Sequence, residues 1–326
     1  MNRLFIPTLL LTSFLIVACQ HKPVERQPET DWQRLELQGP VSKILEITVA
    51  QDTSQLEMMF SPDGMLTDQI YYHNGQIVRH TFYTDSMRWQ ISNTNELEWL
   101  VNIQKNEKGL VTETWSQSAL GEIVTTYTYD SEDRLVTEDN YGDADQLTSS
   151  VFYEYDSKGR LIKETTVDPE GRIEMLVLYT YNRKNQNTVV EQYDGSNRLL
   201  QRQERTYDRA GHTIGEKYTN ADGVIIYNLH STYRNGKLVE KHCTGANIYD
   251  QHYVYLYQDD ILKIVNIEES EDGKVVLRTN RLCDDYGNWI VEQEQQLAEY
   301  GELDSSNNSN SFRTTSNTYR EITYFQ

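Results

Sequence analysis

The chain is expected to be an all-β protein, an antiparallel meander that forms one extended, twisted or curled single sheet. Three observations predict this fold: a tyrosine followed by a turn recurs every 26 residues, side chains alternate between the turns, and no segment of useful length has a helical period. The recurring tyrosines are Tyr129, Tyr155, Tyr181, Tyr207 and Tyr233. A fixed period of this length is typical of repeat architectures, in which each unit packs on its neighbours.

Each 26-residue unit contains two turns, half a period apart. The first turn follows the tyrosine, as at 156–160, and the second includes segments such as 168–171 and 220–223. Both are rich in Asp, Asn, Pro and Gly, which tolerate or preset turn dihedrals. Alternate residues share one face of each intervening strand: Leu147, Ser149, Val151, Tyr153 and Tyr155 in one unit, and Ile173, Met175, Val177, Tyr179 and Tyr181 in the next. Such short connections leave no room for crossover helices.

The chain divides into three parts. Residues 1–18 are expected to be a lipoprotein signal peptide, 19–31 a lipidated polar tether, and 32–326 the β-repeat domain. Within that domain the repeats are clear over 103–262 and degenerate over 60–102 and 263–290. The Ser- and Asn-rich segment 301–317 is expected to be a mobile loop, because it cannot bury enough area to offset its ordering entropy. Residues 318–325 return to strand patterning.

The N-terminal segment predicts export rather than a membrane span. Arg3 gives a positive start, and residues 4–18 form an apolar run of fifteen residues. At about 1.5 Å per residue this run is shorter than a hydrocarbon core of roughly 30 Å.

The end of that run resembles the lipobox of bacterial lipoproteins, with Ile16, Val17 and Ala18 before Cys19. The resemblance implies cleavage after Ala18, acylation (palmitate or similar chains) of Cys19, and a near-permanent membrane anchor. Because Gln20 is not the Asp associated with inner-membrane retention, it favours the outer membrane, on the periplasmic face or at the cell surface. The alternative is an ordinary signal peptide with an incidental cysteine.

Composition fits an exported, solvated β protein. Hydrophobic residues make up 37% of the chain, and 23 Tyr stand against 7 Phe, so much of the apolar area carries a hydroxyl. The formal net charge of −20 opposes nucleic-acid backbones. Nucleic acid is therefore excluded as a partner, and solubility explains the charge more simply than an acidic binding function does.

The segment from Tyr155 to Leu161, Tyr-Asp-x-x-Gly-Arg-Leu, resembles the YD repeat of Rhs-type and teneurin-type proteins. Together with the lipobox, the segment 285–289 and the terminal strand at 320–324, the chain is similar to lipoproteins of Bacteroidetes. Large Rhs proteins wind such repeats into a shell around a toxin. We find no core segment that closes such a shell and no toxin domain, and the chain is too short to enclose one. The resemblance therefore implies a β-meander and a role in surface interaction or glycan contact.

No catalytic or metal-binding motif is present, so no catalytic residue, metal ligand or cofactor is predicted. His230, His242 and His252 fall on consecutive strands and could converge, but solvated or satisfied histidines are the simpler interpretation. Two acidic groups could hold Ca²⁺ through oxygen ligands, although turn chemistry alone explains them. These groups are Asp143 with Asp145, and Glu268, Glu269 and Glu271 with Asp272.

Two classes of function remain. The favoured one is a non-enzymatic, outer-membrane-anchored repeat lipoprotein that acts as a surface interaction or carbohydrate-contacting platform. Its partners would be the membrane, through Cys19, and a glycan or envelope protein. The candidate ligand contacts are Tyr129, Tyr155, Tyr181, Tyr207 and Tyr233, whose rings could stack on sugars but are better explained as the covered face of the sheet. The alternatives are an envelope glycan hydrolase with an acidic cleft and a purely structural spacer.

Two long-range expectations follow from the meander. The strand that starts at Trp289 should pair with 318–325, since an unpaired final strand would leave an open edge. Cys243 and Cys283 should remain unbridged, although an exported compartment favours disulfides. Three strand steps of about 4.8 Å separate the two cysteines, whereas a disulfide needs Cα atoms within about 7 Å.

Overall fold

The computed structural model describes residues 30–246, 248–297 and 312–326, and 22 antiparallel strands form one sheet in these ranges. The first eleven strands are β1 Val41–Val49, β2 Thr53–Phe60, β3 Leu66–His73, β4 Gln76–Tyr83, β5 Met87–Ser92, β6 Leu97–Lys105, β7 Val111–Ser118, β8 Gly121–Tyr129, β9 Leu135–Tyr141, β10 Leu147–Tyr155 and β11 Leu161–Val167. The remaining eleven are β12 Ile173–Tyr181, β13 Asn187–Asp194, β14 Leu199–Tyr207, β15 Thr213–Asn220, β16 Ile225–Arg234, β17 Lys237–Thr244, β18 Asp250–Gln258, β19 Ile261–Glu271, β20 Lys274–Cys283, β21 Trp289–Leu297 and β22 Phe312–Tyr324. The meander and its 26-residue, two-strand unit are confirmed.

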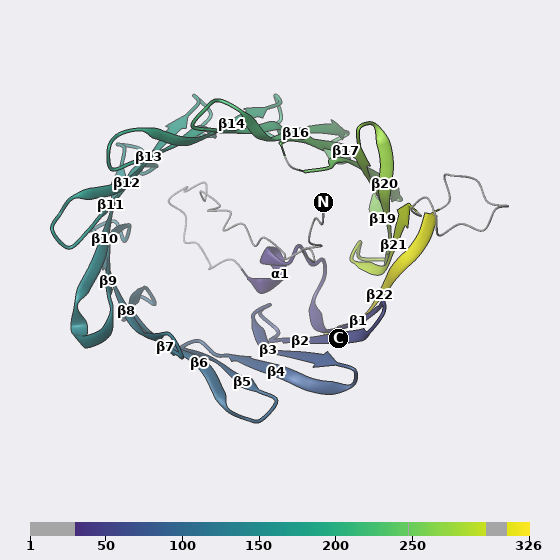
Figure 1. Cartoon of the computed structure of the whole chain (residues 1–326), viewed down its shortest axis with the longest axis horizontal. Coiled ribbons are helices and arrows are strands. Elements are labelled where there is room, and N and C mark those ends of the chain that lie inside the picture. Colours follow the sequence, from purple (N-terminus) through teal and green to yellow (C-terminus); the bar gives the residue numbers. More distant parts are fainter. Residues whose placement is uncertain (1–29, 247, 298–311) are drawn as a thin grey trace, which may run out of the picture.

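The sheet closes on itself, which corrects the expectation of an extended single sheet. Each strand pairs with the next along the chain, and β22 also pairs with β1, with Ile322 opposite Ile44 and Tyr319 opposite Ile47. The result is the ring seen in Figure 1. At about 4.8 Å per strand, 22 strands span roughly 105 Å around the barrel, which is wide enough to enclose a lumen.

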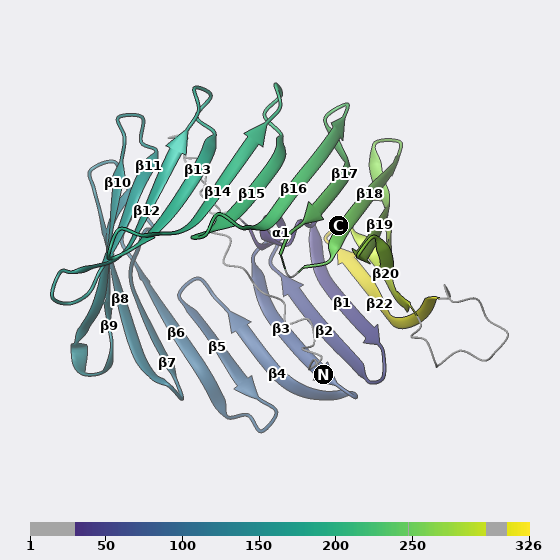
Figure 2. The same ribbon diagram turned by 45° about the horizontal axis from the view of Figure 1, so that its top comes forward.

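All Tyr-Asp turns lie on one rim of the barrel, because they all follow even-numbered strands. We call this edge the Tyr-Asp rim, and it also carries the turn between β2 and β3 and the C-terminal end of β22. The hairpin loops that follow β10, β12, β14 and β16 stand in a row along the top of Figure 2. The turns that follow odd-numbered strands form the opposite rim.

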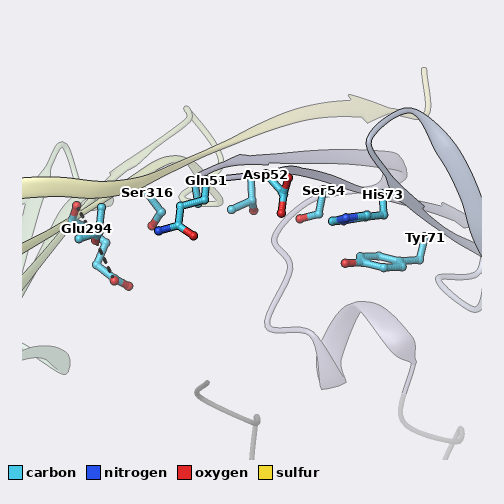
Figure 3. Close-up of a pocket in the computed structure, with 10 residues that line it drawn as sticks. Gln51, Asp52, Ser54, Tyr71, His73, Glu294 and Ser316 are labelled. Carbon is cyan, nitrogen blue, oxygen red and sulfur yellow. Dashed lines mark hydrogen bonds between the residues drawn. The ribbon is translucent and has the colours of Figure 1, made fainter. Parts of the chain in front are cut away.

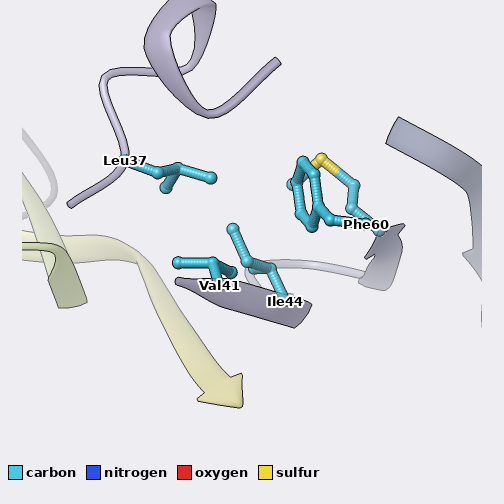
Figure 4. Close-up of a cluster of buried hydrophobic side chains, with 5 residues drawn as sticks. Leu37, Val41, Ile44 and Phe60 are labelled. Carbon is cyan, nitrogen blue, oxygen red and sulfur yellow. The ribbon is translucent and has the colours of Figure 1, made fainter. Parts of the chain in front are cut away.

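The compact hydrophobic core lies inside the ring, beside a short N-terminal segment. Helix α1, Asp31–Arg34, is closed at its N-terminus by a capping box between Thr30 and Gln33. Figure 4 shows the buried cluster below it, in which five apolar side chains meet: Leu37, Val41, Ile44, Met58 and Phe60. The predicted tether at 19–31 is therefore too long, because Thr30 and Asp31 belong to this folded segment.

The core identifies which face of the sheet is internal. Ile44 pairs with Met58, and alternate residues from strand to strand share that inner face around the whole ring. Following the register, the tyrosines of the repeats point inward. The outer face carries ion pairs at mid-strand, including Lys163 with Glu154 at 2.7 Å and Arg278 with Glu268 at 3.0 Å. In the described ranges, no helix is long and apolar enough to cross a membrane.

The terminal hairpin is confirmed, and its last strand begins earlier than expected. Strand β21 pairs with β22 from Leu297 opposite Phe312 to Val291 opposite Tyr319. The expected mobile loop at 301–317 is therefore wrong for residues 312–317, whose alternating side chains extend the final strand. The rest of that loop, and the expected signal peptide and Cys19, lie outside the described residues.

The two remaining cysteines are free, as the strand geometry predicted. Cys243 is buried near the end of β17, whereas Cys283 is half-buried at the end of β20. Because β17 and β20 run in opposite directions, the two residues lie toward opposite rims.

Candidate ligand-binding site

The five predicted contact tyrosines form a row on the inner wall, at the Tyr-Asp rim. Four of them donate a hydrogen bond from the side-chain hydroxyl to a backbone carbonyl of the preceding unit: Tyr129 to Val111 at 2.8 Å, Tyr155 to Leu135 at 2.8 Å, Tyr181 to Leu161 at 2.8 Å, and Tyr207 to Asn187 at 2.5 Å. The fifth ring, that of Tyr233, stacks on His212 with ring centroids 4.4 Å apart. Through these contacts, the row tyrosines hold neighbouring repeat units together.

The residue after four of the five tyrosines closes the turn: Asp130, Asp156, Asn182 and Asp208. In the unit at 155–161, one oxygen of Asp156 accepts from the backbone N–H groups of Lys158 and Arg160, at 2.9 and 3.0 Å, and its other oxygen accepts from the Arg160 guanidinium. The same pattern recurs at Asp130, and Asn182 accepts from two turn N–H groups in the same way. Aspartate or asparagine suits this position because an acidic or amide oxygen three bonds from Cα reaches these donors.

The row tyrosines are half-buried, and burial raises the pKa of all five hydroxyls. The rings of Tyr155 and Tyr181 are further covered by arginines from the preceding unit, with the guanidinium of Arg134 4.9 Å from the ring centroid of Tyr155. The structure thus brings the five predicted residues together in one row, but much of each side chain already contacts other groups of the protein.

The largest cavity described lies beside the row, between the N-terminal segment and strands β18 to β22. Its volume is about 860 Å³. On one side it is lined by residues 33 and 35–38, and on the other by the inner face of β18, where three tyrosines lie at alternate positions: Tyr253, Tyr255 and Tyr257. Sequence reasoning placed a strand here but did not single out these residues as a site, because their grouping depends on the N-terminal segment folding back into the ring.

The tyrosines of β18 form an aromatic wall. The rings of Tyr253 and Tyr255 are nearly parallel, with centroids 6.5 Å apart and planes 12° from parallel. Burial raises the pKa of Tyr255, so its hydroxyl stays protonated and is a hydrogen-bond donor over the physiological range. Tyr257 donates to the carbonyl of Leu238 at 3.0 Å, which fixes the ring in place.

The opposite part of the cavity combines an indole with two arginines. The guanidinium groups of Arg320 and Arg281 lie over the ring of Trp289, 3.4 and 5.5 Å from its centroid. Each arginine is paired with a carboxylate, Arg320 with Glu46 at 2.8 Å and Arg281 with Glu292 at 2.5 Å. Burial lowers the pKa of Arg320, while Glu46 acts in the opposite direction. The cavity therefore offers planar donors without a large net positive charge.

The turn at 284–288 attaches the N-terminal segment to this wall. The side chain of Asn288 is buried; its oxygen accepts from the N–H of Gln38 at 2.7 Å, and its nitrogen donates to the carbonyl of Gln38 at 2.8 Å. Tyr286 stacks on Tyr324, with centroids 4.3 Å apart, and lies against Gly39. Gly39 has a φ of +78°, and a Cβ there would sit 2.6 Å from the Tyr286 ring, so glycine is required.

A second pocket, of about 500 Å³, opens at the opposite rim near the closure of the barrel. Figure 3 shows Asp52, Ser54, Tyr71 and His73 side by side along one part of its wall, with Glu294 on the other. These side chains come from the turn between β1 and β2 and from strands β2, β3 and β21. The pocket is polar and lacks the aromatic wall of the larger cavity.

The three histidines singled out in the sequence are neighbours on the outer face. His230 lies opposite His242, which lies opposite His252, and all three line a pocket of about 440 Å³. His252 is hydrogen-bonded to Glu240 at 2.7 Å. Over the described ranges, no three His, Cys, Asp or Glu side chains are placed to hold a metal ion, and this includes the described members of the two acidic groups considered for Ca²⁺.

Comparison with known proteins leaves the chain without an assigned family. No family model matches it, and no curated protein matches it. Among solved structures, a Tc holotoxin pore of Photorhabdus luminescens carrying a TccC3 mutation is 12% identical, with a TM-score of 0.30. That match covers 85% of this chain but only 18% of the other.

A porin-like protein from Bacteroides uniformis is 11% identical with a TM-score of 0.30, and the match covers 88% of this chain and 99% of the other. The TcdB2-TccC3-TEV structure is 13% identical with a TM-score of 0.23, covering 80% of this chain and 19% of the other. All three scores are below 0.5, so no argument about function rests on them. The geometry alone defines the class, a closed β-repeat barrel with an internal aromatic cavity.

Proposed function

We propose that the protein is a non-enzymatic, outer-membrane-anchored repeat lipoprotein that contacts carbohydrate in its internal cavity. The observation that carries this proposal is the aromatic wall of Tyr253 and Tyr255, which faces Trp289 and its two arginines across the cavity. Aromatic faces stack on the apolar faces of sugar rings, and nearby hydroxyl and guanidinium groups supply directional hydrogen bonds. A volume of about 860 Å³ is within the usual range for small-ligand sites.

The charge balance of the cavity favours a neutral or weakly acidic glycan. Arg281 and Arg320 are each already paired with a glutamate, so a strongly anionic ligand would have to compete with Glu292 and Glu46. Sugar hydroxyls, in contrast, accept from guanidinium groups that remain ion-paired, because each guanidinium has five N–H donors.

The anchor proposed at Cys19 is consistent with the chemistry of the outer wall. Arg202 is paired with both Glu191 and Glu204, and Glu204 is also paired with Lys217, all on outward-facing positions of β13, β14 and β15. Charged groups facing lipid at mid-height are destabilising in a membrane-embedded barrel. These ion pairs therefore favour a solvated barrel held by an acyl chain.

Titration with panels of neutral and acidic oligosaccharides, followed by Trp fluorescence and calorimetry, tests the proposal. Tyr255→Ala should weaken binding about tenfold or more, as expected for loss of a stacking ring. Tyr319→Ala is the matched control, because that ring lies on the outer face and is 47% exposed. Equal affinity in both variants would place the site elsewhere, and release of shortened sugars would favour the hydrolase alternative.

The five row tyrosines are proposed as secondary contacts for a longer glycan that extends from the cavity along the inner wall. Tyr181→Ala and Tyr207→Ala should reduce affinity for long oligosaccharides but not for short ones. A loss that is independent of ligand length would instead reflect disruption of the repeat packing.

A further inference from the structure

Four consecutive loops of the Tyr-Asp rim are basic, although the whole chain has a net charge of −20. These are the turns at 156–160, 182–186, 208–212 and 234–237, which together contain seven Lys or Arg and two Asp. Five of the basic side chains are exposed and repeat with a spacing of 25 or 26 residues between neighbouring turns: Lys158, Arg183, Lys184, Arg209 and Arg234. We call these five residues the basic arc.

The basic arc is not neutralised by neighbouring carboxylates. Within the ranges that the structure describes, none of its five side chains forms an ion pair, whereas lysines on either side of the arc do. Lys108 is paired with Asp133 at 2.7 Å on one side of the arc, and Lys263 with Asp285 at 2.7 Å on the other. The positive charge of the arc therefore remains available to an anionic partner.

The arc is also preorganised. Arg160 donates to the side chain of Asn185 at 3.1 Å, and Lys184 donates to the carbonyl of Arg209 at 2.8 Å, so the first three loops are tied together. Neighbouring Tyr-Asp turns are two strands apart, which places successive basic tips about 10 Å from each other. Figure 2 shows these loops standing in one row above the sheet.

The N-terminal segment reaches the same rim. The N–H of Trp32 donates to the carbonyl of Gly64 at 3.2 Å, and Asp31 accepts from the N–H of Leu66 at 2.6 Å. Both partners belong to the turn between β2 and β3, on the Tyr-Asp rim. Eleven residues separate Thr30 from Cys19, so even a fully extended chain places an acyl group on Cys19 within about 40 Å of Thr30.

We propose that the basic arc docks on an anionic membrane surface, so that the Tyr-Asp rim faces the bilayer. This inference rests on the proposed lipid anchorage of Cys19. Basic side chains near an anionic bilayer are attracted within a Debye length, about 8 Å at physiological ionic strength. The rest of the Tyr-Asp rim, where Asp133 and Asp285 are already paired with lysines, lies on either side of the contact, and the opposite rim faces the solvent.

The test uses the full chain as processed and lipidated by the cell, reconstituted into vesicles of phosphatidylcholine with or without about one third phosphatidylglycerol. Amine-reactive footprinting read by mass spectrometry should show roughly threefold or greater protection of Lys158 and Lys184 on the anionic vesicles only. High salt should remove the protection. Lys274 is exposed at the opposite rim and serves as the internal control.

A triple variant tests whether the charges of the basic arc cause the protection. Arg183→Gln, Arg209→Gln and Arg234→Gln together remove three charges and leave Lys158 and Lys184 as reporters, so their protection on anionic vesicles should fall. Lys217→Gln, on the outer wall, is the matched control and should leave the protection unchanged. Unaltered protection in the triple variant would overturn the docking proposal.

The remaining outcomes separate the inference from the proposed function. A chain that floats with vesicles but shows equal labelling on both lipid compositions would overturn the arc proposal alone. Failure to float with either vesicle would overturn the anchor and, with it, the arc. Protection by soluble polygalacturonate without protection on anionic vesicles would assign the arc to an acidic polysaccharide and overturn membrane docking.

Discussion

The guanidinium of Arg160 lies over the ring of Tyr181, 4.7 Å from its centroid, in the following repeat unit. The hydroxyl of the same ring donates to the carbonyl of Leu161, the residue directly after Arg160. Two consecutive residues of one unit therefore hold the tyrosine of the next. This contact explains why arginine, leucine and tyrosine recur together, because each unit orders its neighbour.

Replacing Tyr181 by Phe should remove this interlock while keeping the ring. We expect a loss of about 1 kcal/mol, because the carbonyl of Leu161 loses a partner in a half-buried setting. The urea midpoint measures the change. Tyr319→Phe, on the exposed outer face, is the control and should leave the midpoint unchanged; equal shifts in the two variants would contradict a specific role for the hydroxyl.

The turn aspartates should produce a pH dependence at low pH. Partial burial acts to raise the pKa of Asp156, but hydrogen bonds from Arg160 and from the turn N–H groups outweigh it and hold that pKa below its ordinary value. The stabilising contribution is therefore complete above about pH 4 and is lost as the pH falls through the folded-state value.

Asp156→Asn should weaken that dependence without destroying the turn. An amide oxygen accepts from the same backbone groups, as the native Asn182 does at 2.8 and 3.1 Å. Thermal melts between pH 3 and pH 7 should show a smaller loss at low pH in the variant than in the native protein. Parallel melting curves would show that Asp156 does not carry the effect.

Glu164 should have the opposite pH dependence. Burial raises its pKa, although a hydrogen bond from Tyr179 at 2.7 Å acts to lower it. Its contribution to stability is complete below about pH 4 and is lost as the pH rises through the folded-state value. Glu164→Gln should therefore raise the melting temperature more at pH 8 than at pH 4, and an effect independent of pH would contradict this.

The ion pair between Glu46 and Arg320 should stabilise the folded state more than an ion pair on the outer face does. Both side chains are about one-fifth exposed and lie at the closure of the barrel. Glu46→Ala leaves a largely buried guanidinium unpaired, and we expect a loss of about 2 kcal/mol or more. Glu154→Ala breaks the exposed pair with Lys163 and should cost less than about 1 kcal/mol in the same chemical denaturation experiment.

The anchor is tested by Cys19→Ala. Without the acylated thiol, the chain should move from the membrane fraction to the aqueous phase in detergent partitioning. Serine at the same position is a second variant that keeps the size of the side chain. Retention of either variant in the membrane fraction would contradict the lipoprotein interpretation.

The repeat was predictable from sequence because its determinants are local. The register of each hairpin is fixed by a turn such as 156–160, so the positions of Tyr155 and Tyr181 followed directly. The placement of His230, His242 and His252 on consecutive strands could be read from the sequence for the same reason. Strand β1 carries no such turn signature, and its partner in β22 lies about 270 residues away, so the closure of the barrel could not be inferred.

The cavity could not be predicted from the sequence, for a related reason. Glu46 and Arg320 come together only after the last strand has joined the first, and the wall at 35–38 depends on the hydrogen bonds between Asn288 and Gln38. The sequence signal was nevertheless present. The segment 285–289 departs from the repeat consensus, and its Tyr286 and Asn288 contact residues 38–39 and Tyr324, at the two ends of the domain.

The pairing of β22 with β1 also determines when, during synthesis, the barrel can close. During synthesis, β1 appears first and its second neighbour, β22, appears last, so one edge of β1 stays open until β22 has been made. Every shorter nascent chain presents two unpaired strand edges, which are templates for aggregation. Completion of the barrel is thus a late, highly non-local step, and such contacts fold slowly. The unfinished sheet is therefore prone to aggregation until β22, which ends at Tyr324, has been synthesised.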